Sequence, residues 1–291
     1  MTAPTQSPTA TSEVKPNTKP SPSLVLREVR EGIATLTLNN PARRNALSGQ
    51  MLKALRVEIE AVAQDETVRA VILAAEGPVF SSGHDLREVV NQPQDVLNEL
   101  FTLCEYTMEA LRLLPKPVIA RVHALASAAG CQLVASCDLV VASTNAAFQT
   151  PGMQIGLFCS TPMVPLSRVV PPKKALEMLF TSRAVLADEA ERMGLVNRIV
   201  PAGDLMSEAR AYALELAGKC APSAMRTIKA QVWRDLMTDL VSSYDHAGEL
   251  MVETFAGEDF KEGLASWQES RSPSFPPLSG EQALIGFDKL C

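Results

Sequence analysis

The stretch ALASAAGCQLVASCDLVVAS, residues 124–143, is apolar or small at nearly every position. It begins in an apolar segment typical of a buried strand, passes through small residues into an apolar helix, and ends in another strand-like segment. One amide side chain, Gln132, interrupts it. A strand, a short connection and a helix in so few residues predict a packed α/β unit. The role of the amide at its centre needs an explanation.

The flanking segments repeat this alternation of strands and helices. LVLREVREGIATLTLNN, residues 24–40, predicts two strands joined at Glu31 and Gly32. Helical spacing relates Leu47, Met51, Leu55, Ile59 and Val62. Further buried strands are predicted in RAVILAAEG, PVIARVHALA and CDLVVASTNAAF, with a helix at about 93–114. Such alternation implies right-handed crossovers and a mainly parallel sheet with covered faces.

The chain divides into three predicted parts. Residues 1–22 are rich in Pro, Thr and Ser and predict a disordered tail, while residues 23–200 form the α/β core. Residues 201–291 predict a helical region, in which the apolar stripes of 223–267 require a partner. The tail lacks both the apolar centre of a secretory signal and the arginines of a mitochondrial presequence. We therefore expect a cytoplasmic location.

Composition narrows the classes of function. The formal net charge of −6 leaves no basic surplus for nucleic acid, so no such partner is expected. No apolar run approaches the roughly 20 residues that span a bilayer, so no membrane partner is expected either. The three histidines are far apart and the six cysteines form no CxxC pair. We expect no metal and no cofactor held by the protein itself.

Two loops of small residues follow predicted strands. In PVFSSGHDLREVV, Asp85 and Glu88 have the spacing of a capping box, which predicts a helix starting just after His84. In LASAAGCQL, small side chains again stand between a strand and an apolar helix. Such loops either allow close packing alone or bring free backbone N–H groups to one developing negative charge. The spacing does not decide between these two interpretations.

Several segments, taken in order, resemble the enoyl-CoA hydratase/isomerase (crotonase) superfamily. They are NNPARRNALSGQML, AVILAAEGPVFSSGHDL, ASAAGCQLVASCDLVVAS and AAFQTPGMQIGLF, followed by ALEMLFTSRAVLADEAERMGLVNRIVP and EDFKEGLASWQESRSPSF. The resemblance covers about residues 24–275. It implies an α/β fold with a spiral of ββα units, helices that mediate trimer or hexamer assembly, and acyl-CoA thioester substrates. Coenzyme A would then enter as part of the substrate.

The resemblance also implies roles for individual residues. The backbone N–H groups of His84 and Ala129 would be the donors of an oxyanion hole that stabilises an enolate. The RRNAL segment and the SSGHDL loop would hold CoA. By this correspondence Arg43 and Arg44 are candidates near the nucleotide phosphates, although solvated surface charge explains either one equally well. Ser82, His84, Asp85 and Leu86 complete the candidate CoA-binding set.

The chain departs from the hydratases of the superfamily at both catalytic carboxylates. Their two glutamates fall on Gln132 and Gly152, neither of which transfers protons near neutral pH. Because each such group contributes about 10²–10⁴ in rate, hydration is expected to be weak. Gln132 either orients a water or the thioester, or satisfies a buried polar position. The alternatives are an acyl-CoA decarboxylase or hydrolase, or a catalytically silent CoA-binding regulatory protein.

Other side chains can replace the missing pair. The imidazole of His84 stands beside a predicted oxyanion donor and titrates in the physiological range, and some decarboxylating members have histidine in this context. Cys159, Ser160 and Thr161 lie where family members vary their catalytic residues. A nucleophilic cysteine, however, needs an activating partner, and the sequence does not identify one.

Overall fold

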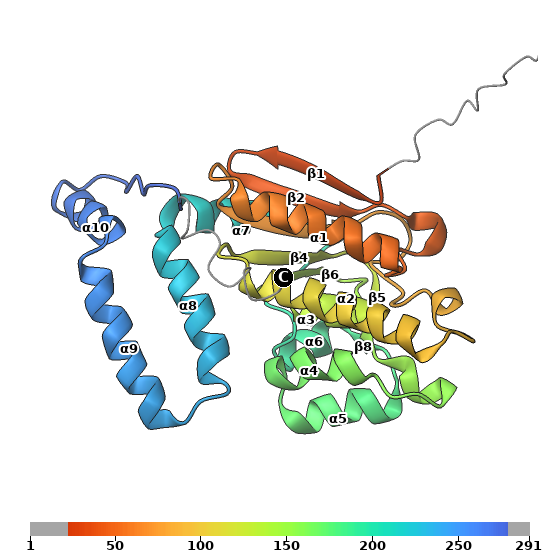
Figure 1. The fold of residues 1–291 in the computed structure, drawn as a ribbon. Coiled ribbons are helices and arrows are strands. Elements are labelled where there is room, and N and C mark those ends of the chain that lie inside the picture. The colour runs from red at the N-terminus through yellow and green to blue at the C-terminus, as the bar shows by residue number, and fades with distance from the viewer. Residues whose placement is uncertain (1–22, 279–291) are drawn as a thin grey trace, which may run out of the picture.

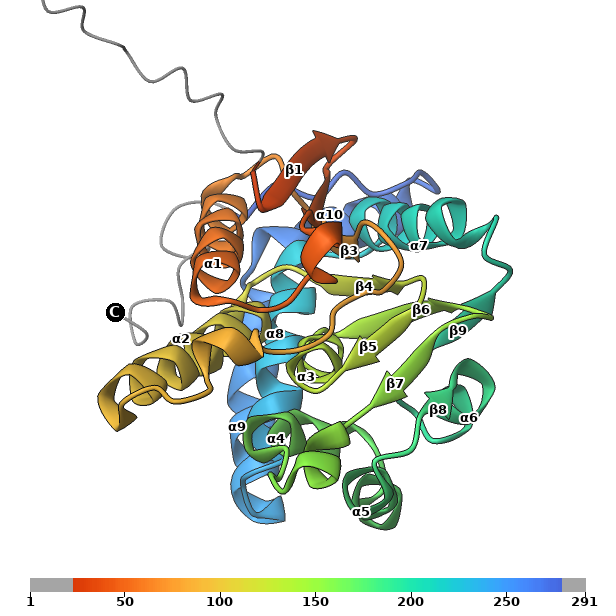
Figure 2. The same ribbon diagram turned by 90° about the vertical axis from the view of Figure 1, so that its right-hand side faces the viewer.

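The computed structural model describes residues 23–278, so the predicted tail 1–22 lies outside the described residues. The main sheet has six strands in the order β1-β2-β3-β4-β6-β9 (Figures 1 and 2). They are β1 (Val25–Arg30), β2 (Ile33–Leu38), β3 (Ala70–Ala75), β4 (Val118–Val122), β6 (Leu139–Ser143) and β9 (Arg198–Val200). Only the β1–β2 pair of this sheet is antiparallel. The prediction of a mainly parallel α/β sheet is confirmed.

A second sheet of three short strands produces the spiral. It contains β5 (Leu125–Ser127), β7 (Ala147–Gln149) and β8 (Val185–Leu186) in the order β5-β7-β8. The chain passes from β4 to β5 and then into α3 (Ala129–Ala135). It passes again from β6 to β7 and then into α4 (Ser160–Val169) and α5 (Pro172–Thr181). Each turn thus places one strand in each sheet before a helix, which confirms the expected ββα units.

The two faces of the main sheet are covered by different helices. In β2, Ala34, Leu36 and Leu38 belong to the large core that includes α1 (Gly49–Gln64) and α2 (Gln94–Leu113). Ile33 on the opposite face belongs to a second core with α7 (Leu205–Lys219). Period-two alternation explains this separation. Although α7 falls in the segment assigned to the helical C-terminal region, it covers the sheet itself (Figure 2).

The last three helices form an arm beside the core (Figure 1). They are α8 (Pro222–Asp235), α9 (Leu240–Phe255) and α10 (Glu258–Gln268), and α6 (Ala187–Arg192) precedes them in the core. A largely buried ion pair fixes α8, because Lys229 Nζ lies 2.7 Å from Asp138 Oδ2. The same ammonium donates to Leu111 O at 2.8 Å. Within the described residues, no helix is both long and apolar enough to cross a membrane.

Candidate active site

Two loops from different turns of the spiral touch at Gly83. This residue has φ +87°, and a Cβ placed there would lie 2.7 Å from Ala128 Cβ and 3.1 Å from Ala129 N. A backbone approach this close requires glycine. The second contact is at Gly130, where an added Cβ would lie 2.6 Å from Ser81 O. The small residues of both loops therefore bring the two backbones together.

The turn before α3 is strained. Ala128 has φ 51° and ψ −120°, a conformation that side chains other than glycine rarely adopt. Its amide donates to Gln149 O at 2.9 Å, which ties the turn to β7. Strain of this kind costs of order 1–3 kcal/mol and is concentrated at functional sites, where the surrounding structure maintains it. Here it directs the start of α3 toward the Gly83 loop.

The amides of His84 and Ala129 are both available at this contact. Leu47 pairs with His84 in a parallel bridge, and its N–H donates to Gly83 O at 2.8 Å. In a parallel bridge the residue paired across the bridge does not use its own amide on the side where its neighbours bond, so the N–H of His84 has no partner in this pairing. Ala129 is the first residue of α3, whose first amides have no partner inside the helix. In the part of the chain that the structure describes, neither N–H has an acceptor.

The side chain of His84 packs against Leu47 and Phe101. Its Nδ1 lies 3.3 Å from Leu47 O, and its ring meets Phe101 edge to face with centroids 5.2 Å apart. The buried Nε2 has no partner in the described residues. Burial lowers the pKa of this imidazole. These contacts give the ring a packing environment rather than that of a catalytic base.

The residues expected to hold CoA lie along the Gly83 loop. Arg43 Nη1 is 3.1 Å from Asp85 Oδ2, and Ser82 N donates to Arg44 O at 3.0 Å. Both arginines are exposed, as is Leu86. The segment also contains Arg87, whose Nε donates to Asp85 Oδ1 at 2.9 Å. The guanidinium groups of Arg43 and Arg87 thus share the one carboxylate of Asp85, and Arg44 is exposed on the same segment.

The helix predicted to start just after His84 is only a short 3₁₀ turn in the structure. Asp85 does cap this turn, because its Oδ1 accepts from Arg87 N at 3.1 Å. Only a 3₁₀ turn, η2 (Leu86–Glu88), follows it. Glu88 does not close the capping box, because its carboxylate accepts the amide of Gly49 at 2.7 Å instead. It therefore supports the start of α1, which begins two residues after the predicted Leu47.

Asn45 in the RRNAL segment is an anchor that the sequence reasoning missed. It is fully buried with φ 49°, and its Nδ2 donates to Glu76 O at 2.7 Å and Val79 O at 3.1 Å. Its backbone carbonyl accepts from Ser81 Oγ at 2.8 Å. An asparagine tolerates the left-handed conformation and bonds to nearby backbone, and this was the available signal. It holds the RRNAL segment against the Gly83 loop.

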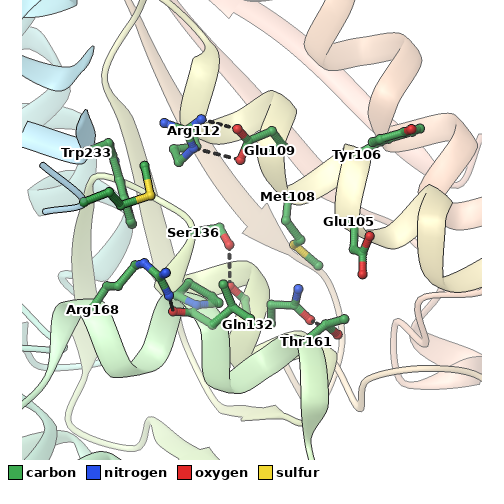
Figure 3. A pocket seen from close by; sticks show the side chains of 13 residues that line it. Glu105, Tyr106, Met108, Glu109, Arg112, Gln132, Ser136, Thr161, Arg168 and Trp233 are labelled. Atoms are coloured by element: carbon green, nitrogen blue, oxygen red, sulfur yellow. Dashed lines mark hydrogen bonds and ion pairs between the residues drawn. The ribbon is translucent and has the colours of Figure 1, made fainter. Parts of the chain in front are cut away.

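Four helices line a cavity of about 450 Å³ next to these loops (Figure 3). The lining positions on α2 and α4 follow helical spacing, so each helix presents one face to the cavity. The walls are Glu105, Tyr106, Met108, Glu109 and Arg112 from α2, Gln132 and Ser136 from α3 and its end, Thr161, Val164, Pro165 and Arg168 from α4, and Trp233 and Met237 from α8 and its end. Gln132, which lines the cavity, stands one helical turn beyond Ala129 in α3.

Gln132 is buried and faces this cavity. Its Oε1 accepts from Thr161 Oγ1 at 2.9 Å, which joins α3 to α4 (Figure 3). The side chain is only 3% exposed. Because the amide oxygen of Gln132 already accepts the Thr161 hydroxyl, its NH₂ group is the one available to donate to a ligand. Both interpretations of Gln132 are compatible with this position, because it satisfies a buried polar site and lines the cavity.

Gly152 packs closely against the segment before α4. An added Cβ would lie 3.0 Å from Cys159 N and 3.0 Å from Cys159 Sγ, so a side chain here requires this segment to shift by a few tenths of an ångström. The amide of Gly152 lies 3.4 Å from the same sulfur. Burial raises the pKa of the Cys159 thiol, which opposes a role as nucleophile. A family glutamate at position 152 would therefore crowd Cys159.

Glu105 is a second group that the sequence reasoning missed. It lies on the wall opposite Gln132 and Thr161 (Figure 3). Glu109, one turn further along α2, is held by Arg112, with Nε 2.7 Å from Oε2. Within the described residues Glu105 has no cation partner. The sequence offered no signal, because a glutamate on an amphipathic helix is ordinarily a solvated surface residue.

A ββα spiral with two small-residue loops meeting beside a helix-lined cavity defines a crotonase-fold enzyme. Residues 28–277 match the Enoyl-CoA hydratase/isomerase family, and the chain belongs to it. It is 45% identical over 253 residues to enoyl-CoA hydratase domain-containing protein 3, mitochondrial, of Rattus norvegicus, which covers 87% of this chain and 84% of the relative. The resemblance to this family seen in the sequence is confirmed.

Solved structures agree with this assignment. The crystal structure of an enoyl-CoA hydratase from Mycobacterium smegmatis superposes with a TM-score of 0.82 at 45% identity, covering 87% of this chain and 98% of that one. The human enoyl Coenzyme A hydratase domain-containing protein 3 gives a TM-score of 0.83 at 42% identity, covering 87% and 100%. The crotonase-like fold is therefore established at high sequence similarity.

The expected cytoplasmic location is wrong by the same comparison. The rat, mouse, frog and human relatives at 44–45% identity are all named mitochondrial. The expectation rested on the absence of arginines from residues 1–22. The composition of these residues was therefore not sufficient to predict the location.

Proposed function

We propose that this enzyme processes acyl-CoA thioesters by stabilising an enolate between the backbone N–H groups of His84 and Ala129. The observation that carries the proposal is the contact of the two loops at Gly83, which leaves both amides without an acceptor in the described residues. Two fixed donors stabilise a developing oxyanion without reorganisation. Loss of one such donor typically costs about 10²–10³ in rate.

The same proposal assigns the charged rim to CoA. Arg43 and Arg44 are exposed on the segment that runs along the Gly83 loop, and Arg87 adds a third cation. Asp85 holds two of these guanidinium groups in place. Guanidinium groups pair with phosphate through charge-assisted hydrogen bonds. Coenzyme A enters as part of the substrate, and no other cofactor is proposed.

Efficient hydration is not part of the proposal. By the resemblance, Gln132 stands in place of one family carboxylate, and Gly152, packed against Cys159, stands in place of the other. Proton transfer at Cα therefore needs another group. Glu105 is the cavity carboxylate that no cation holds in the described residues, and it faces Gln132 across the cavity (Figure 3). We assign proton transfer to Glu105 and expect weak hydratase activity.

Assembly through the C-terminal arm completes the proposal. The helix α9 has no buried residue in the described chain, although Leu240, Val241 and Val252 are each 70–71% exposed. An apolar helix surface of this extent requires cover. Copies of the same chain supply it in a homotrimer or a dimer of trimers. Light scattering tests this assembly, and a monomer at micromolar concentration would contradict it.

The test of the proposed chemistry measures enolate formation directly. Deuterium exchange at Cα of butyryl-CoA, followed by NMR, reports an enolate whatever reaction follows. Ala129→Pro removes one donor and should abolish exchange, whereas Ala129→Gly keeps the donor and should retain it. Proline also disfavours ψ −120° at Ala128, so circular dichroism must accompany the assay.

A matched proline control separates folding from chemistry. Glu258→Pro introduces proline at the first residue of α10, after a residue with ψ 153°, which proline accepts. This variant should exchange like the wild type. A wild-type protein that binds butyryl-CoA without exchange, hydrolysis or decarboxylation of any thioester would instead identify a catalytically silent binding protein.

A further inference from the structure

The cavity has two chemically different ends. Thr161 and Gln132 bond to each other at the end next to the free amides. Arg168 follows Thr161 by seven residues along α4, and Arg112 follows Glu105 by the same number along α2. Seven residues of helix rise about 10 Å. Figure 3 shows Arg112, Arg168 and Trp233 on one side of the cavity, with Glu105, Gln132 and Thr161 on the other.

The far end carries a net positive charge. There Arg112 is neutralised by Glu109, which accepts both Nε and Nη2 of its guanidinium. Arg168 donates Nη1 to Val164 O at 2.7 Å, a bond within its own helix. No carboxylate pairs with Arg168 in the described part of the chain. Its remaining N–H groups are therefore available to a ligand.

The guanidinium of Arg168, beside the apolar ring of Trp233, distinguishes an anionic acyl terminus from an apolar one. A hydrocarbon that reached Arg168 would remove water from a guanidinium and give no hydrogen bond in return. A carboxylate would instead accept two parallel N–H bonds from the planar group. The cavity's other free charge, Glu105, lies at the opposite end, about two helical turns away. An anion at Arg168 thus avoids direct contact with it.

We propose that the acyl group of the substrate ends in a carboxylate, so that the substrates are CoA monothioesters of dicarboxylic acids. The inference rests on the proposed function, in which the thioester carbonyl lies at His84 and Ala129. Arg168 is then the residue that determines specificity. The apolar side chains of Met108, Val164 and Met237 line the cavity and are available to contact the methylene groups of the acyl chain.

The experiment compares two thioesters of equal length. Calorimetry measures the Kd of hexanoyl-CoA and adipyl-CoA, which differ only in the terminal carboxylate. Adipyl-CoA should bind about tenfold more tightly, the factor expected for one charge-assisted pair that is partly exposed. Arg168→Gln should remove this difference, and Arg168→Lys should retain part of it because the charge remains. Arg168 is exposed, so both variants should fold.

A control and the possible outcomes make the test decisive. Arg192→Gln alters an arginine that is 68% exposed on α6 and outside the cavity, and it should keep the tenfold preference. Equal affinity of the wild type for both thioesters would overturn the inference while leaving the proposed function standing. Failure to bind either thioester would overturn the proposed function itself. A preference that survives in Arg168→Gln would show that another group binds the carboxylate.

Discussion

Substitution of Gly83 by alanine tests whether the contact of the two loops creates the oxyanion site. The added Cβ would lie 2.7 Å from Ala128 Cβ, whereas carbon atoms pack at about 3.5–4.0 Å. One loop must therefore move by about 1 Å. The φ of +87° costs an L-residue roughly a further 1–2 kcal/mol. A displacement of 1 Å at a reacting centre typically lowers the rate about 10²-fold.

Deuterium exchange at Cα of butyryl-CoA should fall about 10²-fold in Gly83→Ala, with the affinity for free CoA changed far less. Gly218→Ala is the matched control, because a methyl group at that position in α7 meets no atom of the described residues within 4 Å and α7 lies outside the proposed assembly surface on α9. It should leave exchange unchanged and stabilise α7 slightly. A folded Gly83→Ala protein with wild-type exchange would refute the assignment of the two amides.

Three further substitutions test the rest of the site. Lys229→Met leaves the largely buried carboxylate of Asp138 without its cation and should cost about 1–3 kcal/mol in denaturant unfolding. Adding Asp138→Asn should recover much of this loss, and equal stability of the single variant and the wild type would contradict the role of the pair. Glu105→Gln should lower the rate of Cα exchange by a factor of about 10²–10⁴, because it removes the proposed proton acceptor. Glu109→Gln is the control and should change this rate only several-fold. Similar losses in both variants would contradict the role of Glu105. Gln132→Glu keeps an oxygen that accepts the Thr161 hydroxyl and should raise the rate of crotonyl-CoA hydration about 10²-fold. Loss of enoyl absorbance measures this rate. A folded variant without any gain would show that position 132 does not face the double bond.

Much of the fold could be predicted because its signals are local. The alternation of Ile33, Thr35 and Thr37 with Ala34, Leu36 and Leu38 predicted a strand, and the order of strands and helices predicted a sheet with covered faces. Both covering layers are present. Short strands such as β8 (Val185–Leu186) were not resolved by pattern. Two residues carry no periodicity, and this strand forms only because β7 offers a partner 37 residues earlier.

The site was less predictable because its contacts are not local. The small residues of both loops were visible in the sequence, but the contact between Gly83 and Ala128 was not. The carboxylate of Glu88 was expected to cap its own helix and instead supports α1, 39 residues earlier in the chain. Glu105 had no signal, since its role depends on which face of α2 the cavity occupies. In each case the residue could be recognised in the sequence, but its contact partner depends on the three-dimensional fold.

Gln132 and Gly152, the two positions that match the hydratase glutamates, both lie near the start of α4. Gln132 is tied to α4 through Thr161, and Gly152 is packed against Cys159 at the residue before α4. Gln132→Glu adds a charge at a position that already lines the cavity. In Gly152→Glu the added Cβ would lie 3.0 Å from Cys159 N, so the segment at Cys159 must shift. We therefore expect Gln132→Glu to be tolerated better than Gly152→Glu, because α4, the helix that carries Arg168, constrains position 152 more tightly.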